Sequence, residues 1–229
     1  MRKKLSFLIL LLITFSCEKT PLMTENEGEA VQKVADFFGG YCKLSKGFES
    51  ENTNIKTYSE LEVSESVLLK DSPQKKYTSH SGNIAYLFYS NLGNEKDNHE
   101  EIRVRIISEN GETSDYQYLK TELQEIDQLI SNMNNTTEII KKSDFEKVKN
   151  LFDKTVQVET TQIKNLFKNI ESKFGKTTDY QFQGFEFLES DNYGDIVQLR
   201  LVQIMEKANL YITLNYKRSS KGLLSIEFE

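Results

Sequence analysis

Three residues of this chain carry side chains that could support nucleophilic chemistry: Cys42, His80 and His99. A histidine that removes the thiol proton of a cysteine produces a thiolate nucleophile, and this is the basis of cysteine-dependent hydrolysis. No third residue that would orient such a histidine is recognisable from the spacing. Cys42 lies on an alternating stretch with Leu44, and a small buried apolar residue is the ordinary role of such a cysteine. We therefore favour a structural role for Cys42 and keep a Cys-dependent hydrolase as an alternative.

Two acidic segments contain residue types that bind metal ions. Segment 97–101 (Asp-Asn-His-Glu-Glu) has suitable side chains, but a zinc site needs about four ligands and no second cluster supplies them. Segment 189–195 partly resembles a calcium loop because Gly194 is its sixth residue, yet Arg200 stands where that loop needs a bidentate Glu. We interpret the first segment as a solvated loop and the second as a β-turn, and we expect no metal and no cofactor.

The composition argues against several classes of protein. The chain has 35 acidic and 29 basic residues and a formal net charge of −6. An acidic chain without a basic run lacks the cations that neutralise phosphates, so we expect no nucleic-acid partner. Neither a Gly-Lys-Ser/Thr phosphate loop nor a Gly-x-Ser-x-Gly nucleophile elbow occurs in the sequence. We therefore predict a protein that is not an enzyme.

The N-terminal residues 1–16 predict where the protein works. The cations Arg2–Lys4 precede an apolar run of 11 residues, Leu5–Phe15. This length lies within the 7–15 residues of a secretory signal peptide and is shorter than the ~20 residues that span a bilayer. Ser16 and Cys17 follow the run, so cleavage before Cys17 would free its amino group and leave its thiol for a lipid.

This arrangement resembles the lipobox of Gram-negative bacterial lipoproteins, in which a small residue precedes an obligatory cysteine. Ser16 and Cys17 match the motif, whereas Thr14 stands where an aliphatic residue is usual. The resemblance implies lipidation of Cys17 and a lipidated tether over residues 17–25. Glu18 follows the cysteine in place of the Asp of the best-known inner-membrane retention signal. The resemblance therefore favours the outer membrane, at its periplasmic face or at the cell surface.

The rest of the chain predicts two small α+β domains, residues 26–130 and 143–229. In the first domain, an apolar helical stripe ends at Gly39-Gly40, and alternating strand patterns follow. The apolar residues of segment 81–92 fit both the period of a strand and the period of a helix. Ser81 could cap a helix and Gly93 could end it, so we favour a helix. Residues 131–142 are rich in Asn and Thr, which predicts a linker.

The second domain predicts two helices followed by a four-stranded antiparallel meander. Apolar stripes at 145–156 and 163–174 indicate the helices. Four alternating segments indicate the strands: 178–188, 196–205, 208–217 and 223–228. Helices followed by a meander are typical of an α+β fold.

This order resembles the cystatin-like and NTF2-like domains of small bacterial envelope lipoproteins. The resemblance covers about 85 residues and is carried by three segments: Phe167–Gly175, Tyr180–Phe187 and Leu210–Phe228. It implies a helix packed on the concave face of a curved sheet. Such folds include enzymes, ligand-binding proteins and scaffolds, so the resemblance does not select a function.

Our leading hypothesis is a membrane-anchored binding or scaffold module with a protein partner. Sheet edges can accept a further strand, so the expected contact surface is the sheet face or edge within residues 178–228. The alternative is a small-ligand pocket between helix and sheet. Its aromatic lining would come from five rings: Phe182, Phe185, Phe187, Tyr211 and Tyr216. Aromatic rings commonly fill a core without forming a ligand site.

Overall fold

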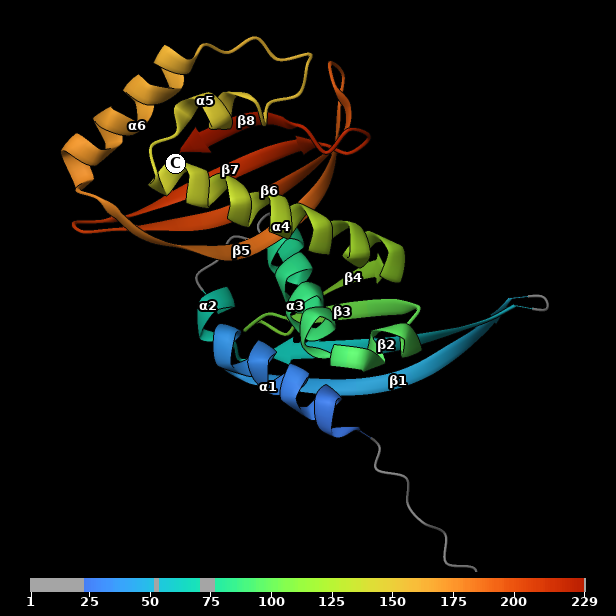
Figure 1. Ribbon diagram of the computed structural model, residues 1–229. Helices are drawn as coiled ribbons and strands as arrows, with labels where there is room; N and C mark the ends of the chain where they lie inside the picture. The colour runs from blue at the N-terminus through green and yellow to red at the C-terminus, as the bar shows by residue number, and fades with distance from the viewer. Residues whose placement is uncertain (1–22, 52–53, 71–76, 229) are drawn as a thin grey trace, which may run out of the picture.

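The computed structural model describes residues 23–51, 54–70 and 77–228 (Figure 1). The predicted signal peptide 1–16 and Cys17 lie outside these residues, as does most of the predicted tether. The first helix, α1 (Glu25–Phe38), begins at the end of that tether. Oγ1 of Thr24 accepts the N–H of Glu27 at 3.1 Å, and the Glu27 carboxylate accepts the N–H of Thr24 at 2.8 Å. This reciprocal capping fixes the start of the helix.

The first half of the chain forms a mixed four-stranded sheet in the order β1-β2-β3-β4. Its strands are β1 (Tyr41–Glu51), β2 (Asn54–Ser64), β3 (Glu101–Ile107) and β4 (Thr113–Leu119). β1–β2 and β3–β4 are antiparallel, whereas β2 and β3 are parallel. A parallel pair needs a long crossover. The crossover consists of α2 (Val67–Lys70), α3 (Tyr77–Asn91) and a short 3-10 helix, η2 (Gly93–Asn98).

The helix predicted at residues 81–92 is confirmed as α3, and the alternating segments are confirmed as strands. Helices α1 and α3 cover one face of the first sheet, whose buried side chains include Leu61, Val104 and Ile106. The opposite face carries charged residues such as Arg103 and Arg105. Strand alternation thus gives this sheet one covered and one solvated face.

Residues 131–142 are not a linker, because they belong almost entirely to the helix α4 (Lys120–Lys141). The hydroxyls of Thr136 and Thr137 donate to the carbonyls of Asn132 and Asn134. Both threonines are buried, as are Met133 and Ile140 on the same helix. Burial of one helix face thus overrides the weak helix propensity of Asn and Thr.

The second half confirms the predicted α+β order of two helices and an antiparallel meander. Helices α5 (Phe145–Lys149) and α6 (Thr160–Phe174) precede a sheet in the order β5-β6-β7-β8. The strands are β5 (Thr177–Ser190), β6 (Gly194–Met205), β7 (Asn209–Lys217) and β8 (Leu223–Phe228). The predicted turn at 189–195 is confirmed, since Ser190 pairs with Gly194 across it.

The helix predicted at residues 145–156 is shorter than expected. α5 ends at Lys149, and the chain then runs beside the start of β8. Leu223 donates its N–H to the carbonyl of Leu151 at 2.9 Å and accepts the N–H of Asp153 at 2.8 Å. The edge of β8 thus provides the backbone partners that a longer helix would have satisfied internally.

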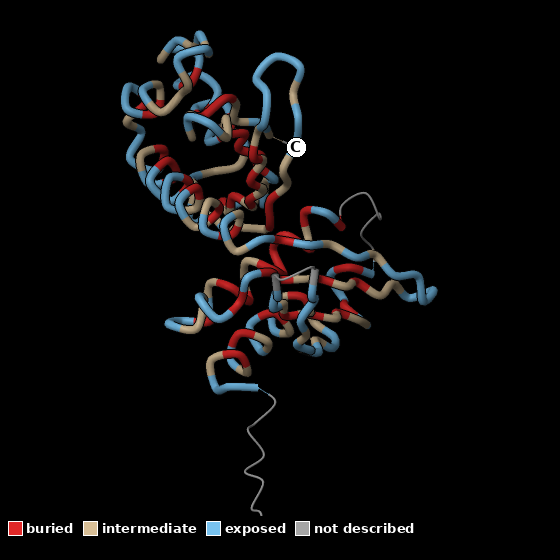
Figure 2. The backbone as a smooth tube through the Cα atoms, turned by 90° about the vertical axis from the view of Figure 1, so that its right-hand side faces the viewer, coloured by how far each residue is buried: buried red, intermediate tan, exposed pale blue. Residues whose placement is uncertain are grey.

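The two halves share one hydrophobic core, in which α3 lies between the sheets (Figure 1). In Figure 2 the buried segments extend from one half into the other. Rings from both halves meet edge to face: Tyr86 with Phe182 at 5.6 Å and Tyr118 with Phe185 at 5.3 Å. Such pairs stabilise a core beyond their buried area.

Two glycines allow α3 to approach β5 at backbone distance. A Cβ at Gly82 would lie 2.6 Å from the carbonyl oxygen of Phe185, and one at Gly184 would overlap the carbonyl of Ser79. Gly184 also has a φ of +143°, which residues with side chains rarely adopt. The junction of the halves therefore requires glycine on both elements.

We predict that Gly184→Ala lowers the free energy of unfolding by about 3 kcal/mol, because it combines backbone strain with overpacking. The matched control is Gly111→Ala, since Gly111 has a φ of +81° but no atom within 4 Å of an added Cβ. The control should lose only about 1–2 kcal/mol of its free energy of unfolding, because alanine is strained in a left-handed backbone conformation. Urea unfolding measures the free energy of unfolding of both variants. Equal losses in the two variants would contradict the role of the close approach between α3 and β5.

Candidate functional site

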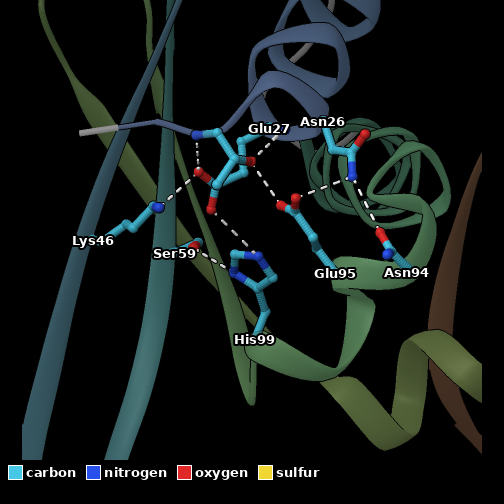
Figure 3. Close-up of polar contacts among 8 residues, drawn as sticks. Asn26, Glu27, Lys46, Ser59, Asn94, Glu95 and His99 are labelled. Atoms are coloured by element: carbon cyan, nitrogen blue, oxygen red, sulfur yellow. Dashed lines mark hydrogen bonds and ion pairs between the residues drawn. The ribbon is translucent and has the colours of Figure 1, made fainter. Parts of the chain in front are cut away.

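His99 is the centre of a buried polar cluster that joins α1 to the first sheet (Figure 3). Its Nε2 lies 3.5 Å from Oε1 of Glu27, and its Nδ1 lies 2.7 Å from Oγ of Ser59. Lys46 of β1 contacts the other oxygen of Glu27 at 2.6 Å. The exposed fractions of Glu27, Ser59 and His99 are only 2%, 1% and 5%.

The charges of the cluster are balanced within it. Burial alone would raise the pKa of Glu27, but hydrogen bonds from Lys46 and from the Thr24 N–H leave it lowered. Burial lowers the pKa of His99, although the nearby Glu27 carboxylate opposes this shift. At neutral pH, Glu27 is therefore ionised and paired with Lys46, and His99 is neutral.

The order of groups in this cluster resembles an acid–histidine–hydroxyl relay, in which histidine deprotonates a serine. A relay needs room for a substrate beside the hydroxyl. Ser59 is only 1% exposed, so its hydroxyl is enclosed. It lines neither the hollow beside Glu65 and Tyr77, nor the hollow beside Arg103, nor the cavity beside Phe167. We therefore assign these groups to the positioning of α1, which directly follows the predicted tether.

Cys42 and His99 are not brought together. Cys42 pairs with Val63 across β1 and β2, whereas Ser59, which contacts His99, pairs with Lys46. Four residues along an extended strand correspond to about 13 Å. Burial raises the pKa of the Cys42 thiol to about 12, so the sulfur is protonated at neutral pH. His80 lies on α3, with its ring centroid 6.1 Å from that of Phe38.

The side chains of segment 97–101 diverge. Asp97 contacts Lys120 at 3.3 Å, and Glu100 accepts the N–H of Thr57 at 3.2 Å. Glu101 is buried and pairs with Arg103. Across residues 23–51, 54–70 and 77–228, no group of three or more His, Cys, Asp or Glu side chains is arranged to hold a metal.

The aromatic residues predicted to line a ligand pocket are distributed differently. Phe182 and Phe185 pack at the junction of the halves, Tyr216 is buried in the core, and Tyr211 is exposed. Between α4, α6 and the second sheet lies a cavity of about 10 Å³, bordered by Phe167 among others. This volume corresponds to about one water molecule, so this cavity has no room for a larger ligand.

The outer part of the β1–β2 hairpin carries two strongly exposed apolar side chains on one face. Pairing of β2 with β3 begins only at Tyr58, so Phe48–Glu51 and Asn54–Thr57 form a two-stranded ribbon, here called the arm. The arm extends away from the helices (Figure 1). Phe48 is 70% and Ile55 is 66% exposed. They are diagonal neighbours on one face of the ribbon and form an apolar patch.

The base of the arm is fixed to the sheet by Arg103. Its guanidinium lies 3.8 Å from the ring centroid of Tyr58 and 2.7 Å from Oε1 of Glu49. Tyr58 lies directly opposite Gly47, where a Cβ would overlap its ring. Arg103 also borders an open hollow of about 370 Å³ on the solvated face. Because carboxylates there already pair with its arginines, the hollow is a poor site for an anion.

The predicted contact surface within residues 178–228 has partly covered edges. The start of β8 pairs with residues 151–153, and α3 packs against β5. By contrast, β1 has no strand beyond it in the described chain. The sequence reasoning missed the arm, although Phe48 and Ile55 are apolar residues in an otherwise polar stretch. It also missed Glu27 and Ser59, which have no local signature.

Comparisons with protein-family models, with curated proteins and with solved structures give no match to this chain. In the described residues, no helix combines the length and the apolar character needed to cross a membrane. Candidate functions therefore rest on geometry and on the N-terminal sequence.

We predict that Glu27→Gln lowers the free energy of unfolding at pH 7 by about 1.5–3 kcal/mol, the contribution of a hydrogen bond to a charged group. The folded-state pKa values of Glu27 and His99 are both depressed. Each group therefore stabilises the fold at pH values above its unfolded-state pKa, which is about 4.3 for Glu27 and about 6.5 for His99. Stability should fall with pH, first below about 6.5 and again below about 4.3.

Urea unfolding between pH 7 and pH 3 measures this effect. The difference between wild type and Glu27→Gln should shrink as the carboxylate of Glu27 becomes protonated. Glu29→Gln is the control, because Glu29 is exposed on the same helix. A difference that is independent of pH would contradict the assigned ionisation of Glu27.

Proposed function

We propose that this protein is a lipid-anchored lipoprotein of the cell envelope that binds a protein partner through its arm and acts without catalysis. Its anchor is the lipidated Cys17, and the outer membrane is the favoured location. The observation that carries the proposal is the exposed apolar patch of Phe48 and Ile55 beside the open strand β1. An exposed apolar patch and an unpaired edge are two features that recognise other proteins.

The position of the arm suits an anchored binding protein. Helix α1 follows the tether and is locked to β1 through Glu27 and Lys46. The arm is the outer part of the same strand, so the tether and the binding surface are mechanically connected. Anchoring concentrates the protein at one membrane face, and weak contacts can then suffice for association.

The alternatives receive less support from the geometry. A ligand pocket between helix and sheet would need far more than the cavity of about 10 Å³. A hydrolase built on Cys42 would need a thiolate, whereas burial raises the pKa of this thiol.

The lipid anchor is tested by Cys17→Ser in the cells that produce the protein. We expect loss of labelling by radioactive palmitate and a shift of the protein from the membrane fraction to the soluble fraction, because cysteine provides the acylated thiol and amino group. Cys42→Ser is the matched control and should keep both properties. Palmitate labelling that persists in Cys17→Ser would refute the anchor.

The arm is tested by Phe48→Ser combined with Ile55→Ser in an affinity capture from detergent-solubilised envelope. Both side chains are exposed, so the free energy of unfolding should change by less than about 0.5 kcal/mol each. We expect a stoichiometric partner to be retained by the wild type and reduced at least about tenfold by the double variant. Leu166→Ser, at an exposed apolar position on α6, is the control. Equal capture by all three forms would refute binding through the arm.

A further inference from the structure

Strand β1 is a long and regular open edge. Its pairing with β2 runs from Tyr41 to Glu51 without a register shift. On its other side, the described chain supplies no backbone hydrogen-bond partner. A row of unpaired N–H and C=O groups of this length is a template for a further strand.

The features that commonly protect an edge strand are few in β1. Natural edges are made short, bulged, proline-containing or charged to prevent pairing. β1 has 11 residues, no proline and no bulge. Of its two lysines, Lys46 lies on the covered face and is neutralised by Glu27 at 2.6 Å. Only Lys43 places a cation on the solvated face of this edge.

We infer that a second copy of this chain occupies the edge, with the two β1 strands antiparallel. This inference rests on the proposed function and names the partner of the edge. A two-fold axis at Lys46 places Lys43 opposite Glu49 of the second copy, twice in the dimer. It also uses the whole strand, because Tyr41 and Glu51 are equally distant from residue 46.

In this register, the side chains of one β1 strand complement those of the β1 strand of the second copy. Oε1 of Glu49 contacts Arg103 of its own chain, which leaves the second carboxylate oxygen for Lys43 of the other copy. On the covered face, the half-buried Leu44 lies opposite Phe48, whose ring is otherwise exposed. The two Lys46 side chains meet at the axis, but each is already paired with Glu27. A parallel arrangement in register would instead oppose Lys43 to Lys43, which like charge disfavours.

Pairing in this way makes one continuous eight-stranded sheet from the two first sheets. It covers half of the apolar patch, because Phe48 is on β1 and Ile55 is on β2. Each dimer would carry two lipid anchors, and two anchoring signals hold a protein at a membrane far more firmly than one.

The inference is tested with residues 23–229, which contain every described helix and strand. Sedimentation velocity from about 1 to 200 μM should show a reversible dimer. Lys43→Glu should raise the dimer dissociation constant about tenfold, since like charges then face each other twice. Glu112→Lys, at an exposed turn, should leave the constant unchanged. A chain that stays monomeric up to 200 μM would refute the inference.

The register is tested by disulfide trapping in a Cys42→Ser background. Lys43→Cys and Glu49→Cys are prepared separately and mixed. Directly opposed residues have Cβ atoms about 4.5–5.5 Å apart, within reach of a disulfide. We expect covalent dimers in the mixture and few in either variant alone, because identical positions lie far apart across the axis. Equal cross-linking in all three samples would refute this register.

These results separate the inference from the proposed function. A monomeric chain that still captures a different protein through Phe48 and Ile55 would refute self-pairing and keep the arm as a binding site. A trapped dimer that captures nothing else would support self-pairing and refute a separate partner. A monomeric chain that also captures no partner would refute both the self-pairing and the proposed function.

Discussion

The close contact between α3 and β5 holds the two halves of this protein in one body. Gly82 and Gly184 remove the two side-chain carbons that would keep the backbones apart. Once the backbones approach, Tyr86 reaches Phe182 and Tyr118 reaches Phe185 across the junction. The same helix closes the parallel β2–β3 crossover, so the first sheet and the junction depend on one element.

A second constraint is the burial of charge beneath α1. An isolated carboxylate in a protein interior is unfavourable unless it is paired and hydrogen-bonded. Glu27 meets this requirement by capping its own helix and by contacting Lys46 and His99. Removing Lys46 would leave the buried carboxylate of Glu27 without its cation. The cluster therefore fixes the first helix, which follows the predicted anchor, at one position on the sheet.

The edges of the two sheets are covered to different extents, and the proposed function is based on this difference. The second sheet has α3 beside β5 and residues 151–153 beside the start of β8. The first sheet leaves β1 open and extends it into a ribbon with only one partner strand. A two-stranded ribbon is marginally stable alone. Arg103, stacked on Tyr58 and paired with Glu49, stiffens it where it leaves the sheet.

Local sequence patterns were sufficient for most of the elements. Alternation identified the strands of both sheets, and Gly39 and Gly175 marked where α1 and α6 end. The order of helices and strands then predicted an α+β fold with a C-terminal antiparallel meander, as observed. These features depend on neighbours within a few residues, which is the range over which a sequence pattern acts.

The errors lie where distant contacts prevail over local preference. The Asn/Thr-rich segment of α4 is helical because Thr136 and Ile140 are buried against distant residues. The helix beginning at Phe145 stops early because β8 captures residues 151–153.

The candidate site could not be predicted for the same reason. Ser59 and His99 meet through a parallel strand pair whose partners are some forty residues apart. The exposure of Phe48 follows from β3 starting opposite Tyr58, which leaves the arm without a third strand. The sequence by itself determined the elements and the predicted lipid anchor. The tertiary structure decided which polar groups are buried together and which edge is open, because strand order and register are long-range properties.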